Sequence, residues 1–233
     1  MSGRAVSART KRTAFGRRAG RFLFRTIVSS LLRTSQTARR TQFDALSPAQ
    51  GRVVMLGDSI TEFGNWNEWF PDVPVVNRGI GGEISGQVLE RLDSAIDHPL
   101  GVFLLVGTND LAFDVAPLEI AHNVASILQE IERVAPGTPV VVQSVMPRAL
   151  VFRDEIVALN LLFQNLVANA PDCVRYLDLW DALATPEGAL RPELTEDKLH
   201  LNGNGYREWV GAIRPIMTEF DLRKRRTSRA VQP

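Results

Sequence analysis

The chain has 233 residues, which suits one α/β domain with a short extra segment. Its formal net charge is +1, yet residues 1–50 hold 11 Lys/Arg and a single acidic residue, Asp44, whereas residues 51–221 hold 11 Lys/Arg and 25 Asp/Glu. One cysteine excludes an intrachain disulfide, and one cysteine with three histidines excludes zinc-finger and HExxH metal sites. The apolar runs are too short for a transmembrane helix.

The first 50 residues predict a basic N-terminal arm. Apolar side chains between residues 22 and 32 would share one side of a helix, so we expect an amphipathic helix over residues 18–33. The pattern is compatible with contact with an anionic membrane or a partner, with an arm that is floppy or docked on its own domain, and with targeting. Nucleic-acid binding is disfavoured, since the acidic body repels phosphate. We expect a cytoplasmic or membrane-peripheral protein, and a targeting role of the arm stays open.

From residue 51 onward, strand and helix patterns alternate. Short β-branched apolar runs predict strands over residues 53–56, 73–77, 102–106, 138–145 and 175–179. Helical spacing predicts helices over residues 85–96, 117–134, 154–170 and 204–220. The alternation predicts an α/β domain over residues 51–221, with a parallel sheet between two layers of helices. Residues 222–233 then form a basic C-terminal tail.

Polar residues directly follow the predicted strands. Ser59 follows the first strand, the glycines 79–82 follow the second, and Asn109 follows the third. Ligands of open α/β sheets bind outside the carboxyl ends of the strands, so these residues are expected to converge. Ser59 is a candidate nucleophile, although Asp-Ser after a strand is also typical of a helix N-cap.

A serine nucleophile needs a general base, usually a histidine. His98 precedes a proline on the far side of the predicted sheet, and His122 lies off the apolar face of a helix. His200 follows Asp197 by three residues, so the carboxylate can bind Nδ1–H and leave Nε2 to accept the Ser59 proton. Taken alone, such a pair is more often a surface or capping pair.

Gly82 and Asn109 are candidate donors for an oxyanion. Glycine lets a backbone N–H approach a substrate, and the Asn109 amide is a suitable donor. With the Ser59 backbone N–H, they would supply the donors that an acyl-transfer oxyanion requires. Each position is also compatible with an ordinary turn or helix cap.

Four segments together resemble the sequence blocks of the SGNH (GDSL-type) hydrolase family, in the family order. They are Gly57-Asp58-Ser59, Asn77-x-Gly79-x-Gly81-Gly82, Gly107-x-Asn109-Asp110 and Asp197-x-x-His200. The sequence looks most similar to the branch with the platelet-activating-factor acetylhydrolase catalytic subunits and related bacterial esterases. Isoleucine replaces leucine in the first block, and Thr61 replaces the second glycine of a G-x-S-x-G elbow. The resemblance implies a flavodoxin-like, five-stranded parallel sheet of order 2-1-3-4-5.

The resemblance also implies a serine esterase that acts on a small-molecule ester without a cofactor or metal. It assigns Ser59 as nucleophile, His200 as base, Asp197 as its orienting acid, and Gly82 and Asn109 as oxyanion donors. One alternative is an acyltransferase or carbohydrate O-deacetylase with the same triad, and another is an inactive membrane- or partner-binding module. If the N-terminal arm serves only membrane contact, deletion of residues 1–45 is expected to leave ester turnover intact.

Three aromatic residues shortly after Ser59 are compatible with two roles. Trp66, Trp69 and Phe70 would either line an acyl pocket or pack a helix against the sheet.

Overall fold

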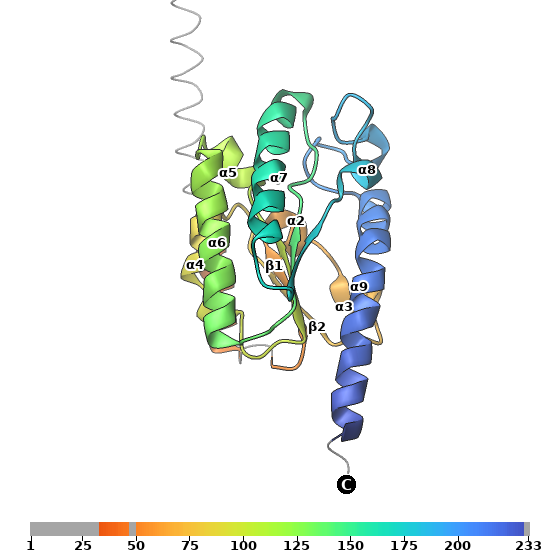
Figure 1. The fold of residues 1–233 in the computed structure, drawn as a ribbon. Coiled ribbons are helices and arrows are strands. Elements are labelled where there is room, and N and C mark those ends of the chain that lie inside the picture. The colour runs from red at the N-terminus through yellow and green to blue at the C-terminus, as the bar shows by residue number, and fades with distance from the viewer. Residues whose placement is uncertain (1–32, 47–49, 231–233) are drawn as a thin grey trace, which may run out of the picture.

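The computed structural model describes residues 33–46 and 50–230, and the side chains as far as residue 222. A parallel sheet of order β2-β1-β3-β4-β5 lies between two layers of helices (Figure 1). Its strands are β1 Val53–Gly57, β2 Val75–Gly79, β3 Gly101–Leu105, β4 Val140–Gln143 and β5 Val174–Leu177. The predicted fold class and strand order are confirmed.

The central strands β1 and β3 are buried along their whole length. Each face of the sheet packs into its own hydrophobic core, and alternate side chains of β1 point to the two faces. Val54 and Leu56 lie in one core, and Val53 and Met55 lie in the other. Strands covered on both faces read as continuous apolar runs, which is why the sequence predicts them well.

One face of the sheet is covered by α4 (Ser85–Glu90), α6 (Pro117–Val134) and α7 (Arg153–Ala168) (Figure 1). Helix α6 begins with a proline, which is tolerated in a first turn because its missing N–H would be unpaired there. Its buried stripe is Ile120, Val124, Ile127, Leu128 and Ile131. The predicted bounds of α6 agree with the structure.

The opposite face is covered by α9 (Gly203–Ala230), together with α3 (Trp66–Trp69) and α8 (Trp180–Leu183). The Trp66 ring packs edge-on against Trp209 of α9 at 4.8 Å between centroids. Trp66 and Phe70 are buried in this core, and Trp69 is partly buried against it. The packing role of these aromatic residues is therefore confirmed.

Two predicted helices end several residues away from the predicted position, and the other helix ends differ by at most two residues. The helix predicted over residues 85–96 stops at Glu90, and a 3₁₀ turn, η1 (Leu92–Ser94), follows it. Arg91 leaves the helical conformation at φ −118°, and its buried guanidinium donates to the carbonyl groups of Gly57 and Arg78. At the other end of the chain, α9 continues to Ala230 through most of the predicted tail, which contains no glycine or proline to end it before that residue.

A helical segment over residues 33–45 packs on the domain. Its Phe43 is only 2% exposed and contacts the guanidinium groups of Arg39, Arg78 and Arg91 at 4.8, 4.7 and 5.8 Å from the ring centroid. This part of the predicted arm is docked, which was one of the open alternatives. The predicted amphipathic helix over residues 18–33 lies outside the described residues apart from Arg33. In the described part of the chain, no helix has both the length and the apolar character to cross a bilayer.

Candidate active site

Ser59 is the first residue of α2 (Ser59–Glu62), directly after β1. The N-cap is Asp58, whose Oδ1 accepts the Ile60 backbone N–H at 3.0 Å. Because Asp58 caps the helix, the Ser59 hydroxyl is available for another partner. Ser59 Oγ lies 3.0 Å from His200 Nε2.

His200 and Asp197 lie in the loop before α9. Asp197 Oδ2 is 2.6 Å from His200 Nδ1, and Oδ1 accepts the backbone N–H groups of Leu199 and His200. Lys198 has a left-handed φ of 65°, which turns the chain back so that one carboxylate reaches both backbone and ring. The contact favours a proton on Nδ1 and leaves Nε2 as the acceptor toward Ser59.

The Asp197 carboxyl stays ionised although it is partly buried. Partial burial acts to raise its pKa, but hydrogen bonds from the His200 ring and from the backbone of His200 and Leu199 outweigh it and lower the pKa to about 2. An ionised carboxylate beside Nδ1 orients the ring and can stabilise an imidazolium.

Gly82 lies in the loop after β2, with a left-handed φ of 73°. Asn77, at the centre of β2, holds this loop to the end of α2. Its Nδ2 contacts the carbonyl oxygens of Thr61, Glu62 and Gly64 at 2.8–3.2 Å, and its Oδ1 accepts the Gly79 N–H. The loop that bears Gly82 is therefore fixed beside Ser59.

Asn109 lies in α5 (Thr108–Ala112), which begins three residues after the end of β3. Its Nδ2 donates one hydrogen bond to the Glu83 carbonyl at 2.9 Å. A side-chain amide has two N–H groups, so one remains for a ligand while the other holds the residue after Gly82.

Residues 55–208 match the model of the GDSL-like lipase/acylhydrolase family. The chain belongs to this family. The conclusion agrees with the resemblance of the four sequence blocks.

Relatives and solved structures of this family support the same conclusion. The chain is 27% identical over 175 residues to the rat platelet-activating factor acetylhydrolase IB subunit alpha1, covering 71% of this chain and 74% of the relative. A Streptococcus pneumonia structure described as a platelet activating factor is 28% identical, covers 84% of this chain and 98% of that one, and has a TM-score of 0.76. A Bacteroides thetaiotaomicron GDSL-like lipase is 25% identical, covers 79% and 97% of the two chains, and has a TM-score of 0.64.

Two further buried residues beside Asn109, namely Ser85 and Asp110, were given no role from the sequence. The Asp110 carboxylate accepts the backbone N–H of Ser85 at 2.9 and 3.0 Å and its hydroxyl at 2.5 Å. Asn123 of α6 donates to the same hydroxyl at 2.9 Å. Burial raises the pKa of Asp110, and the hydrogen bonds from Ser85 oppose that rise. The available signal was an aspartate directly after Asn109, in the short helix that follows the buried strand β3.

Three other polar residues take no part in the Ser59–His200–Asp197 contacts. His98 is exposed and pairs with Asp97 at 3.0 Å, and His122 is exposed on α6. Arg148 donates to the carbonyl and hydroxyl oxygens of Thr108, next to Asn109. Among the described residues, no group of three or more His, Cys, Asp or Glu side chains is placed to hold a metal ion.

Proposed function

We propose that this chain is a serine esterase that cleaves carboxylic esters through an acyl-enzyme. The observation that carries the proposal is the continuous contact from Ser59 Oγ to His200 Nε2 at 3.0 Å and from His200 Nδ1 to Asp197 Oδ2 at 2.6 Å. This order of groups is the one that activates a serine hydroxyl.

In the first half-reaction, Ser59 Oγ attacks the ester carbonyl carbon while its proton passes to His200 Nε2. Asp197 stabilises the imidazolium, and the carbonyl oxygen becomes an oxyanion held by Asn109 and by the backbone N–H groups of Gly82 and Ser59. When the ester C–O bond breaks, His200 returns the proton to the leaving alcohol, and the acyl group stays on Ser59.

In the second half-reaction, a water molecule takes the place of the alcohol. His200 removes its proton, the same donors hold the oxyanion, and the carboxylic acid leaves as Ser59 recovers its hydrogen. An acyltransferase would use an alcohol or sugar hydroxyl in this step, and a carbohydrate O-deacetylase would use water on an acetylated sugar.

We propose a small ester with a short acyl group as the substrate class. The rat relative is named as an acetylhydrolase, and its 27% identity over 71% of this chain supports acetyl as the first acyl group to test. No cofactor or metal has a part in the proposed steps.

A panel of substrates tests the proposal. Turnover of p-nitrophenyl esters of two to twelve carbons, of acetylated sugars, and of both with added acceptor alcohols separates esterase, deacetylase and acyltransferase. We expect free acid as the main product and fastest turnover for short acyl chains. Turnover that persists in Ser59→Ala, or no turnover of any ester, would contradict the proposal.

Peripheral membrane contact stays a separate prediction from the basic sequence of the N-terminal arm. Deletion of residues 1–32, which keeps the docked segment 33–45, should abolish sedimentation with anionic vesicles at low salt. Sedimentation that is unchanged by the deletion or by high salt would exclude this contact. A cytoplasmic or membrane-peripheral location also stays a prediction.

A further inference from the structure

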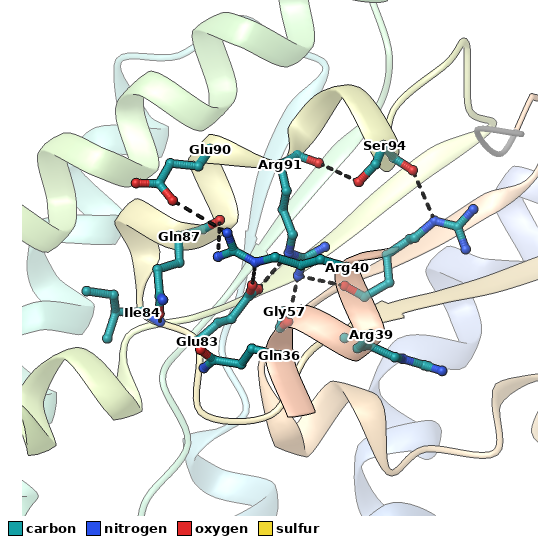
Figure 2. Close-up of polar contacts among 12 residues, drawn as sticks. Gln36, Arg39, Arg40, Gly57, Glu83, Ile84, Gln87, Glu90, Arg91 and Ser94 are labelled. Atoms are coloured by element: carbon teal, nitrogen blue, oxygen red, sulfur yellow. Dashed lines mark hydrogen bonds and ion pairs between the residues drawn. The ribbon is translucent and has the colours of Figure 1, made fainter. Parts of the chain in front are cut away.

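Glu83, directly after Gly82, is a fully buried carboxylate. Arg91 Nε donates to its Oε2 at 2.6 Å, and Arg40 Nε donates to its Oε1 at 2.9 Å (Figure 2). A buried carboxylate is costly unless it is paired, so the two arginines together keep Glu83 in place. Arg91 belongs to the hydrolase domain, but Arg40 comes from the helical segment 33–45.

The same segment holds the peptide bond that carries the Gly82 N–H. Gln36, only 6% exposed, donates from Nε2 to the Gly81 carbonyl oxygen at 3.0 Å. In a planar trans peptide, the C=O of one residue and the N–H of the next point in opposite directions. By fixing the Gly81 C=O, Gln36 therefore fixes the direction of the Gly82 N–H.

The loop has one internal backbone hydrogen bond, from the Glu83 N–H to the Ile80 carbonyl at 3.3 Å. It closes a four-residue turn, but turns closed in this way differ in the direction of their central peptide, here the one between Gly81 and Gly82. Three of the four residues from Gly79 to Gly82 are glycines, which allow many backbone conformations. Glu62 Oε2 accepts the Gly81 N–H at 2.7 Å, and Glu62 in turn pairs with Arg39 of the helical segment at 3.4 Å. The segment thus contacts the loop directly through Gln36 and Arg40, and through Glu62.

We propose that the helical segment 33–45 is a working part of the acyl-transfer site, in which Gln36 and Arg40 are positioning residues for the Gly82 N–H. The inference rests on the proposed esterase function and on Gly82 as an oxyanion donor. It reverses one expectation from the sequence: deletion of residues 1–45 lowers ester turnover, whereas deletion of residues 1–32 preserves it.

The test compares two glutamines of one helix. Gln36→Met removes the donor at nearly constant length and keeps good helix propensity, and Gln42→Met makes the same change at an exposed position. Loss of an oxyanion donor costs about 10²–10³ in kcat, so a misdirected donor should cost at least about tenfold. We expect Gln36→Met to lower kcat for p-nitrophenyl acetate, and the rate of labelling by a fluorophosphonate, by about tenfold or more. KM should change less than about threefold, and Gln42→Met should match the wild type.

Arg40 provides a second, independent pair of variants. Arg40→Met should lower kcat in the same way, and Arg40→Lys should recover part of the loss because it restores a positive charge near Glu83. Kinetics measured well below the thermal unfolding midpoint of each variant ensure that the losses come from the site and not from unfolding. If Gln36→Met does not fold, the Arg40 pair decides by the same measurements.

Hydrogen exchange separates failure of the inference from failure of the proposed function. Backbone amides of residues 81–83 should exchange faster in Gln36→Met than in wild type or Gln42→Met, with or without an ester. A wild type that turns over no ester and takes no fluorophosphonate would refute the esterase, and the exchange rates would still decide whether the helix holds the loop. A folded Gln36→Met with wild-type kcat, or with unchanged exchange at residues 81–83, would overturn the inference.

Discussion

The two sides of the candidate site are built in different ways. On one side, Asp197 and His200 meet within one turn of a half-exposed loop, and their contacts span three residues of the chain. On the other side, the residues around Gly82 and Asn109 are held by buried polar contacts between distant parts of the chain, such as Arg40 with Glu83 and Ser85 with Asp110.

The difference has consequences for both chemistry and stability. A histidine on an exposed loop can exchange protons with solvent, and few other contacts depend on it. Donors for an oxyanion must instead be fixed before the reaction. They stabilise the transition state because they need not reorganise when the negative charge develops. Buried, hydrogen-bonded polar groups provide that rigidity, and removal of one partner leaves another unpaired.

The largest expected effect is on the histidine side. His200→Ala or Ser59→Ala should lower kcat/KM for p-nitrophenyl acetate by about 10⁴-fold or more, as the loss of a triad member does. His200→Ala should also leave the free energy of unfolding nearly unchanged, since the His200 loop is partly exposed. His122→Ala, an exposed histidine of α6, is the matched control and should keep wild-type kinetics. Activity of His200→Ala within tenfold of wild type would remove it as the base.

A smaller kinetic effect, joined to a loss of stability, is expected on the oxyanion side. Asn109→Ala should lower kcat by about 10²–10³. It also leaves the Glu83 carbonyl without this donor, which should cost about 1 kcal/mol of unfolding free energy. Urea unfolding and steady-state kinetics measure the two quantities, with the exposed Asn169→Ala as control. A kcat loss below tenfold would exclude Asn109 from the oxyanion role.

The two aspartates closest to Ser59 and His200 should respond to pH in opposite ways. Burial raises the pKa of Asp58 to about 7, although the hydrogen bond from the Ile60 N–H opposes it. A carboxyl with a raised folded-state pKa stabilises the fold below its unfolded pKa and loses that contribution as pH rises toward 7. Asp197, with its lowered pKa, contributes above its unfolded pKa and loses that contribution as pH falls toward 2.

Asp58→Asn tests the first of these trends, since asparagine keeps the N-cap but has no charge. Between pH 5 and pH 8, wild type should lose about 1–3 kcal/mol more unfolding free energy than the variant, at about 1.4 kcal/mol per pKa unit. Urea unfolding at both pH values measures this, with the exposed Asp172→Asn as control. The same pH dependence in Asp58→Asn and wild type would refute the buried-acid account.

The sequence predicts the local features of this molecule well. Buried strands are recognisable as apolar runs, the polar residues that follow them lie in the candidate site, and the Asp197–His200 spacing reflects a contact within one loop. The strand order and the family assignment followed from the four blocks and are confirmed.

Long-range polar contacts could not be predicted in the same way. Gln36, Arg40 and Phe43 lie on one helical stripe at intervals of four and three residues, but only Phe43 is apolar, so the stripe gave no signal of burial. The partner of Arg40 is a glutamate 43 positions away. The end of α4 at Glu90 depends likewise on Arg91, whose guanidinium reaches Glu83 and two backbone carbonyl groups.

The most direct test of the central claim is to locate the covalent adduct. The full-length protein is incubated with a fluorophosphonate, and its intact mass and peptide map are measured beside those of Ser59→Ala and His122→Ala. We predict one adduct, on Ser59, in wild type and His122→Ala, and none in Ser59→Ala. An unlabelled wild type, or an equal adduct on another residue in Ser59→Ala, would contradict Ser59 as the nucleophile.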